Sequence, residues 1–337
     1  MGIILDKLPP MLRPGTRTSL AAMAVTACVL GVSACGGDDD AAGAPTASGL
    51  DVVAELYPLS FVAERVSAGV ADVHNLTPAA SEPHDLELTP RVRAELDDAD
   101  LVVYLSGMIP AVDDAVAGSD HAFDVRAAAR LVEHADDDHD DHTDDHDGTG
   151  HADGQHDGDG HEHGVSDPHF WLDPIRLADV ADALAVRLGD ASPGDADRFV
   201  AAAADLRREL EALDAEFASG LSDCARRELV TSHTAFGYLA DRYALHQIGV
   251  AGLSPHEEPS PARLAEVSDL VREHGVSTIF HEVGVDDRHA DTIATETGAA
   301  VAVLDPLETL SDVSPGGDYL AVMRANLESL RAGLECR

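Results

Sequence analysis

Two adjoining segments, His134 to His163 and Asp167-Pro-His-Phe-Trp-Leu-Asp-Pro174, organise the rest of this chain. The first holds eight histidines, eleven aspartates and one glutamate in thirty residues, with no lysine or arginine. The second contains the only tryptophan. This composition predicts that the first segment captures a metal ion, whereas the second is typical of the rim of a site that retains one.

The His-rich segment combines imidazoles, the commonest protein ligands for borderline metals, with carboxylates that add hard oxygens. Most of its histidines are three to five residues apart, so a flexible loop can bring two or three onto one ion. Its only apolar residues are two alanines, which predicts disorder without metal. The alternative is a solvated acidic spacer. The predicted auxiliary capture residues are His134, His139, His142, His146, His151, His156, His161 and His163.

The length of 337 residues allows two domains with cores of their own. The formal net charge is −41, and Lys7 is the only lysine. Such a surface repels nucleic acid and anionic lipid headgroups and attracts cations, so no nucleic-acid partner is expected. The acidity extends well beyond the His-rich segment, and salt adaptation or a biased composition explains it more simply than function does.

The N-terminus predicts an export signal over residues 1–34. Arg13 and Arg17 precede a short apolar run and then Val32-Ser-Ala-Cys35. The run is too short for a stable transmembrane helix. Val-Ser-Ala-Cys resembles the lipobox of bacterial lipoproteins, which implies lipidation of Cys35, a flexible tether over 35–49 and anchoring on the extracytoplasmic face of a membrane.

Two cysteines remain after the signal and Cys35 are set aside. Cys224 and Cys336 are an even pair in an oxidising compartment, which predicts a disulfide between the start of the second lobe and the chain's end. The alternative is two unrelated buried thiols.

From Leu50 onwards, short apolar runs alternate with amphipathic stretches, the pattern of parallel sheets flanked by helices. Candidate strands are residues 51–56, 73–76, 100–105, 121–125, 228–232, 246–252, 278–280 and 300–304. Candidate helices are residues 58–69, 89–99, 109–116, 174–188, 195–221, 234–243, 261–274, 287–297 and 318–333.

The candidate helix over 195–221 is long enough to connect two lobes, because it spans about 40 Å at 1.5 Å per residue. Its large apolar residues recur at helical intervals. We therefore predict an α/β protein with an N-terminal lobe over 50–192, a linking helix over 193–221 and a C-terminal lobe over 222–337, each lobe a mostly parallel sheet flanked by helices.

Four segments at predicted strand ends carry ligand-type side chains, and in open α/β sheets ligands bind beyond the carboxyl ends of strands. His84, His169 and His233 supply imidazoles, and Leu304-Asp-Pro-Leu-Glu-Thr-Leu310 offers two carboxylates, Asp305 and Glu308. Three imidazoles and one carboxylate form a closed tetrahedral set suited to zinc.

Together these motifs resemble the zinc-binding lipoproteins of ABC import systems, the cluster A-I (cluster 9) solute-binding family. The resemblance rests on Glu82-Pro-His-Asp85, Asp167 to Pro174, Thr231-Ser-His-Thr-Ala-Phe-Gly-Tyr-Leu-Ala240 and Gly252-Leu-Ser-Pro-His-Glu-Glu-Pro-Ser-Pro261. It implies that the three histidines bind metal between two rigid lobes. It also implies that this chain, as a monomer, passes its cargo to an ABC permease in the membrane.

The resemblance also bears on the metal and its fourth ligand. Relatives that carry manganese tend to have a carboxylate in place of His233, so Zn²⁺ is expected and manganese is less favoured. The resemblance places the ligating carboxylate at Glu308. Asp305, beside Pro306, is the alternative ligand or a brace for the turn, and water is a third candidate.

Four further interpretations complete the prediction. Some zinc members pair a C-terminal cysteine with one in the strand at 278–280; this chain has none there, which supports the Cys224–Cys336 pair. His281-Glu-Val-Gly-Val285 lacks the second histidine of a zinc-protease motif. A zinc hydrolase is less favoured because no separate general base lies near the four motifs, so no enzyme activity is expected. A zinc buffer without a permease is the other alternative.

Overall fold

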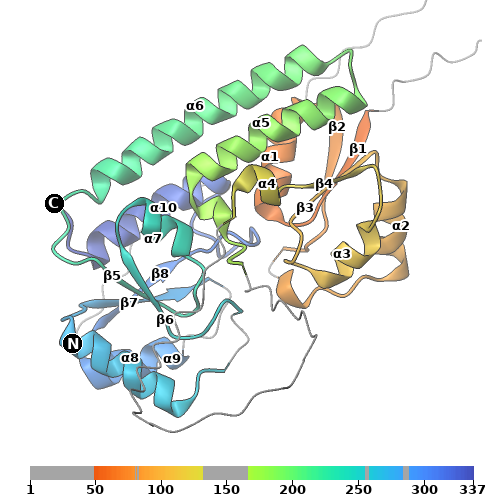
Figure 1. Ribbon diagram of the computed structural model, residues 1–337. Coiled ribbons are helices and arrows are strands. Elements are labelled where there is room, and N and C mark those ends of the chain that lie inside the picture. Colours follow the sequence, from red (N-terminus) through yellow and green to blue (C-terminus); the bar gives the residue numbers. More distant parts are fainter. Residues whose placement is uncertain (1–48, 80, 82, 132–165, 255–257, 284–287) are drawn as a thin grey trace, which may run out of the picture. The chain divides into compact units, whose positions relative to one another are not determined.

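The computed structural model describes residues 49–79, 81, 83–131, 166–254, 258–283 and 288–337 (Figure 1). Cys35 and the eight histidines of residues 134–163 lie outside the described residues, so the predictions made for them stay predictions. Within the described ranges, every helix is too short or too polar to cross a bilayer.

Two four-stranded parallel sheets form the framework, which confirms the predicted fold class. The strand orders are β2-β1-β3-β4 and β6-β5-β7-β8, so both lobes repeat one topology. The strands are β1 Leu50–Ala54, β2 Ala71–Asn75, β3 Leu101–Tyr104, β4 Ala122–Asp124, β5 Glu228–Thr231, β6 His246–Gly249, β7 Thr278–Glu282 and β8 Ala300–Leu304.

Most helices begin where the sequence provides a start signal. Proline occupies the first turn of α1, α2, α3, α5 and α8, where its missing N–H costs no hydrogen bond. The helices are α1 Tyr57–Ser67, α2 Pro90–Asp98, α3 Pro110–Val116, α4 Arg126–Ala129, α5 Pro174–Ala191, α6 Ala196–Gly220, α7 Gly237–Arg242, α8 Pro261–Glu273, α9 Arg288–Thr297 and α10 Tyr319–Gly333, with 3₁₀ turns η1 Pro83–Asp85 and η2 Phe170–Leu172.

The long helix α6 runs beside α5 and also contacts α1 and α10 (Figure 1). Its buried face matches the predicted stripe, with Phe199, Leu206, Leu210, Leu213 and Phe217 fully covered. One apolar cluster continues from the first sheet through α5 and α6 to α10. The connection between the sheets is therefore a packed pair of helices, whereas the sequence predicted one linking helix.

Cys224, just beyond α6, and Cys336, just beyond α10, form a disulfide in the structure. The bonded pair also forms an isolated antiparallel bridge. Backbone hydrogen bonds join residues 225 and 226 to 335 and 334 on one side of it and residue 337 to 223 on the other. A loop of 112 residues is thereby closed, which limits the conformations of the unfolded chain.

The strand order reverses between β1 and β3 in the first sheet and between β5 and β7 in the second. In the first lobe this point holds Glu55, which is fully buried and accepts a hydrogen bond from the backbone N–H of Leu105 at 2.8 Å. Burial raises the pKa of Glu55 well above its usual value, and although the Leu105 N–H lowers it in part, the nearby charges of Asp113 and Asp124 raise it further.

We predict that this glutamate makes the stability of the first lobe fall as pH rises. Above the pKa of an exposed glutamate, about 4.3, the unfolded chain loses a proton that folded Glu55 keeps. Stability then falls by up to about 1.4 kcal/mol per pH unit until the pH reaches the folded pKa. Glu55→Gln stays neutral at all pH values, so its stability relative to wild type should increase from pH 5 to 8.

Thermal unfolding of both proteins with chelator present, followed by circular dichroism at several pH values, measures this difference. A difference in melting temperature between the two proteins that stays constant from pH 5 to 8 would contradict the prediction.

Candidate metal centre

Four side chains from separate connections meet at the carboxyl ends of the strands. His84 lies on η1 after β2, and His169 directly precedes η2 at the start of α5. His233 follows β5, and Glu308 follows β8. The sequence placed His233 at the junction of strand and helix, but β5 ends at Thr231 and α7 begins only at Gly237, so His233 lies in the connection between them.

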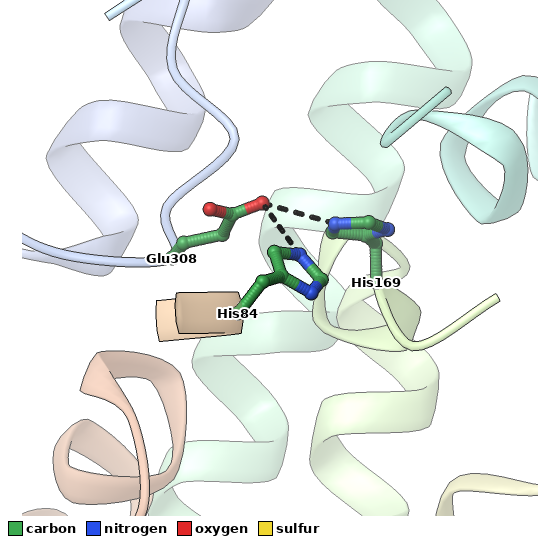
Figure 2. A group of neighbouring side chains, drawn as sticks. All are labelled: His84, His169 and Glu308. Carbon is green, nitrogen blue, oxygen red and sulfur yellow. Dashed lines mark hydrogen bonds and ion pairs between the residues drawn. The ribbon is translucent and has the colours of Figure 1, made fainter. Parts of the chain in front are cut away.

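One oxygen of Glu308 is the point on which the imidazoles converge. Its Oε1 atom lies 3.0 Å from Nε2 of His169, 3.4 Å from Nε2 of His233 and 3.9 Å from Nε2 of His84. Figure 2 shows the His84, His169 and Glu308 side chains pointing toward one another. The side chains of His169 and His233 are almost completely buried, and that of His84 is 16% exposed.

The charges in this cluster shift one another's proton affinity. Burial alone lowers the pKa of His169, but its hydrogen bonds to Asp167 and Glu308 more than offset burial and raise the pKa to about 9. Burial likewise opposes the charge on His233, while Glu282 and Glu308 raise its pKa to about 10. Burial opposes the charge on Glu308 too, yet its bonds to the imidazoles hold its pKa well below the usual value.

Asp305 has a different role from Glu308 in the structure. It is 2% exposed, and its Oδ1 atom accepts a hydrogen bond from the backbone N–H of Leu307 at 2.8 Å. Leu307 is fully buried with a φ of 60°, a left-handed conformation that costs energy for a leucine. Asp305 thus braces the turn that presents Glu308, and the structure brings Glu308 to the histidines.

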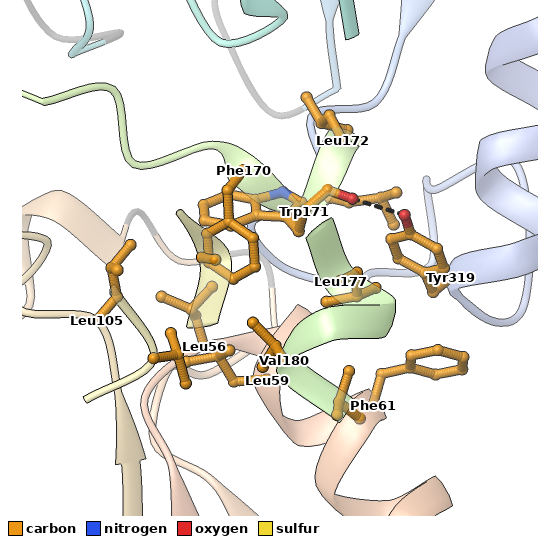
Figure 3. Packing of buried hydrophobic residues seen from close by; sticks show 14 of the residues in the cluster. Leu56, Leu59, Phe61, Leu105, Phe170, Trp171, Leu172, Leu177, Val180 and Tyr319 are labelled. Atoms are coloured by element: carbon orange, nitrogen blue, oxygen red, sulfur yellow. Dashed lines mark hydrogen bonds between the residues drawn. The ribbon is translucent and has the colours of Figure 1, made fainter. Parts of the chain in front are cut away.

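Two side chains from other elements hold the same turn in place. Asn326 of α10 accepts a hydrogen bond from the backbone N–H of Asp305 at 2.9 Å and donates one to its carbonyl at 2.7 Å. The indole N–H of Trp171 donates to the carbonyl of Pro306 at 2.8 Å. Tyr319 in turn donates its hydroxyl proton to the carbonyl of Trp171, and this contact lies within the buried apolar cluster (Figure 3).

Two buried carboxylates beside the histidines were not assigned a role from the sequence. Asp167 is 2% exposed and contacts Nδ1 of His169 at 2.8 Å. Glu282, the last residue of β7, is 1% exposed and forms an ion pair with Nδ1 of His233. From the sequence, no separate general base is expected near the motifs; the structure places these two carboxylates beside the histidines, where imidazoles engage both of them. The Asp-Pro-His spacing could have indicated Asp167; no local pattern indicates Glu282.

The remaining histidines of the described part lie elsewhere. His281 is on strand β7, so the helical geometry of a zinc-protease motif does not exist there. His121 contacts the Ser119 hydroxyl and the Leu96 carbonyl. His74 is exposed and lies 3.7 Å from Asp72 and 3.9 Å from Asp51 at the surface.

A protein-family model described as "ZnuA: Zinc-uptake complex component A periplasmic" matches residues 52–333. The chain belongs to this family. Among its relatives, ZnuA of Bacillus subtilis, a "high-affinity zinc uptake system protein", is 33% identical over 319 residues, which cover 92% of this chain and 96% of the relative. The zinc-binding protein AdcA of Streptococcus pyogenes is 36% identical over 285 residues, 83% of this chain. That match covers 55% of AdcA, so this chain spans about half of AdcA's length.

Solved structures share the ZnuA-family fold. The laminin-binding protein Lmb of Streptococcus agalactiae, described as a bifunctional protein with adhesin and metal transporting activity, is 32% identical with a TM-score of 0.71. The match covers 85% of this chain and all of Lmb. The Zn(II)-bound ZnuA-like domain of Streptococcus pneumoniae AdcA is 29% identical with a TM-score of 0.68, covering 85% of this chain and 99% of that domain.

We predict that Tyr319→Phe will destabilise the protein by about 1–3 kcal/mol, because it leaves the buried carbonyl of Trp171 without its donor while keeping the aromatic ring. Urea unfolding in the presence of chelator measures the loss. Tyr104→Phe is the matched control, since the Tyr104 hydroxyl makes no hydrogen bond within the described part of the chain and its removal should change stability by less than about 0.5 kcal/mol. Equal effects of the two variants would contradict the role given to Tyr319.

Proposed function

We propose that this chain is the extracytoplasmic zinc-binding component of an ABC importer and that it binds one zinc ion between its two lobes through His84, His169, His233 and Glu308. The convergence of three imidazole Nε2 atoms on one oxygen of Glu308, at 3.0 to 3.9 Å, carries the proposal. Each side chain comes from a different connection, so the fold creates the arrangement.

The donor set favours zinc over the other divalent metals of cells. Three nitrogens and one carboxylate oxygen match the tetrahedral sites that zinc occupies in proteins, with ligand distances of about 2.0–2.2 Å. Manganese and magnesium prefer six mainly oxygen ligands, and nitrogen ligands bind manganese more weakly than zinc. Zinc is therefore the cargo that these four side chains favour.

Transport explains the site better than hydrolysis does. A catalytic zinc keeps one position open for water, whereas Glu308 fills the fourth position here. Asp167 and Glu282 could act as bases only by leaving the imidazoles that they contact. Membership of the ZnuA family adds support for zinc uptake. A zinc importer component must deliver its zinc to a permease, whereas a zinc buffer needs no permease, so delivery separates the two functions.

The N-terminal and His-rich segments complete the proposal from their sequences. Lipidated Cys35 tethers the chain to the outer side of the membrane, near the permease. The histidines of residues 134–163 capture zinc weakly and raise its concentration near the buried site, because they are numerous and their spacing specifies no single set of ligands.

The ligand assignment predicts an order of zinc affinities. In the soluble chain without residues 1–35 and 134–163, one tight site should remain. His233→Ala should weaken it by more than about 100-fold, since even outer-shell changes cost 10–100-fold. Glu308→Ala should weaken binding more than Asp305→Ala does, because Asp305 acts only through the turn. Competition with a chromophoric chelator measures all three variants.

Restoring residues 134–163 should add weaker zinc equivalents and leave the tight site unchanged. If tight binding survives Glu308→Ala and is lost in Asp305→Ala, the roles of the two carboxylates are reversed. If the tight site disappears with residues 134–163, the buried histidines are not the main site.

Anchoring and delivery predict a growth phenotype. Cys35→Ala should release the protein from the membrane fraction and slow growth of the host in zinc-depleted medium, with recovery when zinc is added. Immunoblots of cell fractions and growth curves measure both effects. Membrane association that persists in the variant contradicts lipidation, and normal growth of a strain lacking the whole chain in that medium favours the buffer function.

A further inference from the structure

Glu282 presents both of its oxygens to the same histidine. Its Oε1 atom accepts the backbone N–H of His233 at 2.9 Å, and its Oε2 atom lies against Nδ1 of the same residue. The contact follows from the topology: Glu282 ends β7, His233 follows β5, and these strands are neighbours at the point where the strand order reverses. The carboxylate contacts the ring nitrogen on the side opposite Glu308.

Asp167 serves His169 through a single oxygen. Its Oδ1 atom accepts both the backbone N–H of His169 at 2.9 Å and the Nδ1 proton at 2.8 Å. The other ring nitrogen, Nε2, faces Glu308 at 3.0 Å. Each buried histidine is thus held through its backbone N–H and its Nδ1 atom. Glu282 uses one oxygen for each of these groups, whereas Asp167 uses one oxygen for both.

These contacts determine which ring nitrogen can bind a metal. A neutral imidazole has one protonated nitrogen and one lone-pair nitrogen, and an ionised carboxylate can only accept hydrogen bonds. A carboxylate at Nδ1 therefore keeps the proton there and leaves the Nε2 lone pair available on the side of Glu308.

We propose that Glu282 and Asp167 are positioning residues that fix His233 and His169 as Nδ1–H tautomers with Nε2 directed at the metal, and that only Glu282 needs two acceptor oxygens to do so. This inference rests on the zinc-binding function proposed above. It gives a role to Glu282, which lies in the segment where the sequence offered only an incomplete protease motif.

The difference in oxygen use predicts that the same chemical change will act differently at the two positions. An amide has one acceptor oxygen and one NH₂ donor. In Glu282→Gln, one oxygen cannot replace two, so the NH₂ group must face either the backbone N–H or Nδ1 of His233. If it faces Nδ1, it favours the proton on Nε2, where it blocks metal binding.

In Asp167→Asn the single oxygen can still accept both protons from His169, with the NH₂ group turned to the Oδ2 position. Space for the carboxylate group on that side depends on Gly237, because a Cβ atom at that position would lie 2.7 Å from Oδ2 of Asp167. Asp167→Asn therefore removes the charge but keeps the tautomer, and it is the matched control for Glu282→Gln.

The experiment uses the full soluble chain without residues 1–35, labelled with ¹⁵N-histidine. Long-range ¹H–¹⁵N spectra of the zinc-loaded protein show which nitrogen of each buried histidine carries the proton, and chelator competition gives the zinc affinity. In wild type, His169 and His233 should show Nδ1–H with Nε2 bound to zinc. If the tightly bound zinc is coordinated by neither of these two histidines, the proposed function itself is contradicted, independently of the variants.

We expect Glu282→Gln to weaken zinc binding by about 10–100-fold, the usual cost of an outer-shell change. Wherever the NH₂ group faces Nδ1, His233 carries its proton on Nε2 and cannot bind zinc there, so at limiting zinc the Nδ1–H signal of His233 should fall. The pattern of His169 should persist in that variant. Asp167→Asn should keep the pattern of His169 and lose less than about 10-fold in affinity.

An unchanged zinc affinity in Glu282→Gln, or equal affinity losses in the two amide variants, would overturn the inference. If Glu282→Gln does not fold, Asp167→Leu provides the second test, because it removes the acceptor from His169 at similar size. A retained Nδ1–H pattern and wild-type affinity in Asp167→Leu would overturn the inference equally.

Discussion

The proposed metal centre depends on one constraint: the turn that carries Glu308 must stay fixed against histidines from three other connections. Hydrogen bonds from Trp171 to Pro306 and between Asn326 and Asp305 fix the turn, and Tyr319 fixes the backbone of Trp171. The apolar cluster around these groups continues between the lobes. A hinge movement of the lobes would have to open that packing, so zinc binding by small local shifts fits this structure better than closure of two domains.

The charges of the histidines help to stabilise Glu308 in this buried position. A carboxylate buried alone would be costly, but Glu308 contacts His169 and His233, whose raised pKa values let them carry a compensating charge. Asp167 and Glu282 extend this pattern outward, since each buried carboxylate contacts the far side of an imidazole. Acids and imidazoles therefore alternate through the centre of the molecule.

The repeated topology of the lobes places a buried glutamate where the strand order reverses in each sheet. In the first lobe the Glu55 carboxylate accepts the backbone N–H of Leu105, and burial raises its pKa. In the second lobe Glu282 meets an imidazole as well as a backbone N–H. The two glutamates lie on opposite sides of that point, since Glu55 follows β1 whereas Glu282 ends β7, the counterpart of β3. Each accepts a backbone N–H from the connection that follows the neighbouring strand.

The sequence by itself determined most of the strands and long helices, the parallel sheets and the four residues that the fold brings together, but not the short helix α4 or the two 3₁₀ turns. Apolar runs alternating with amphipathic stretches indicate buried parallel strands, and proline and cap residues mark where helices start, so these features are local. The ligand-type residues stood out because they lay at strand ends, and the family resemblance identified Glu308 ahead of Asp305.

Only the tertiary structure decided how those residues are held. The pairing of α5 with α6, the brace between Asp305 and Leu307, and the contact of Glu282 with His233 all join segments or conformations that no local pattern encodes. Glu282 and His233 are 49 positions apart and meet because β5 and β7 are neighbours in the sheet. The sequence gives the chemical type of each side chain, but the hydrogen-bond partner of each ring nitrogen depends on which strands lie side by side.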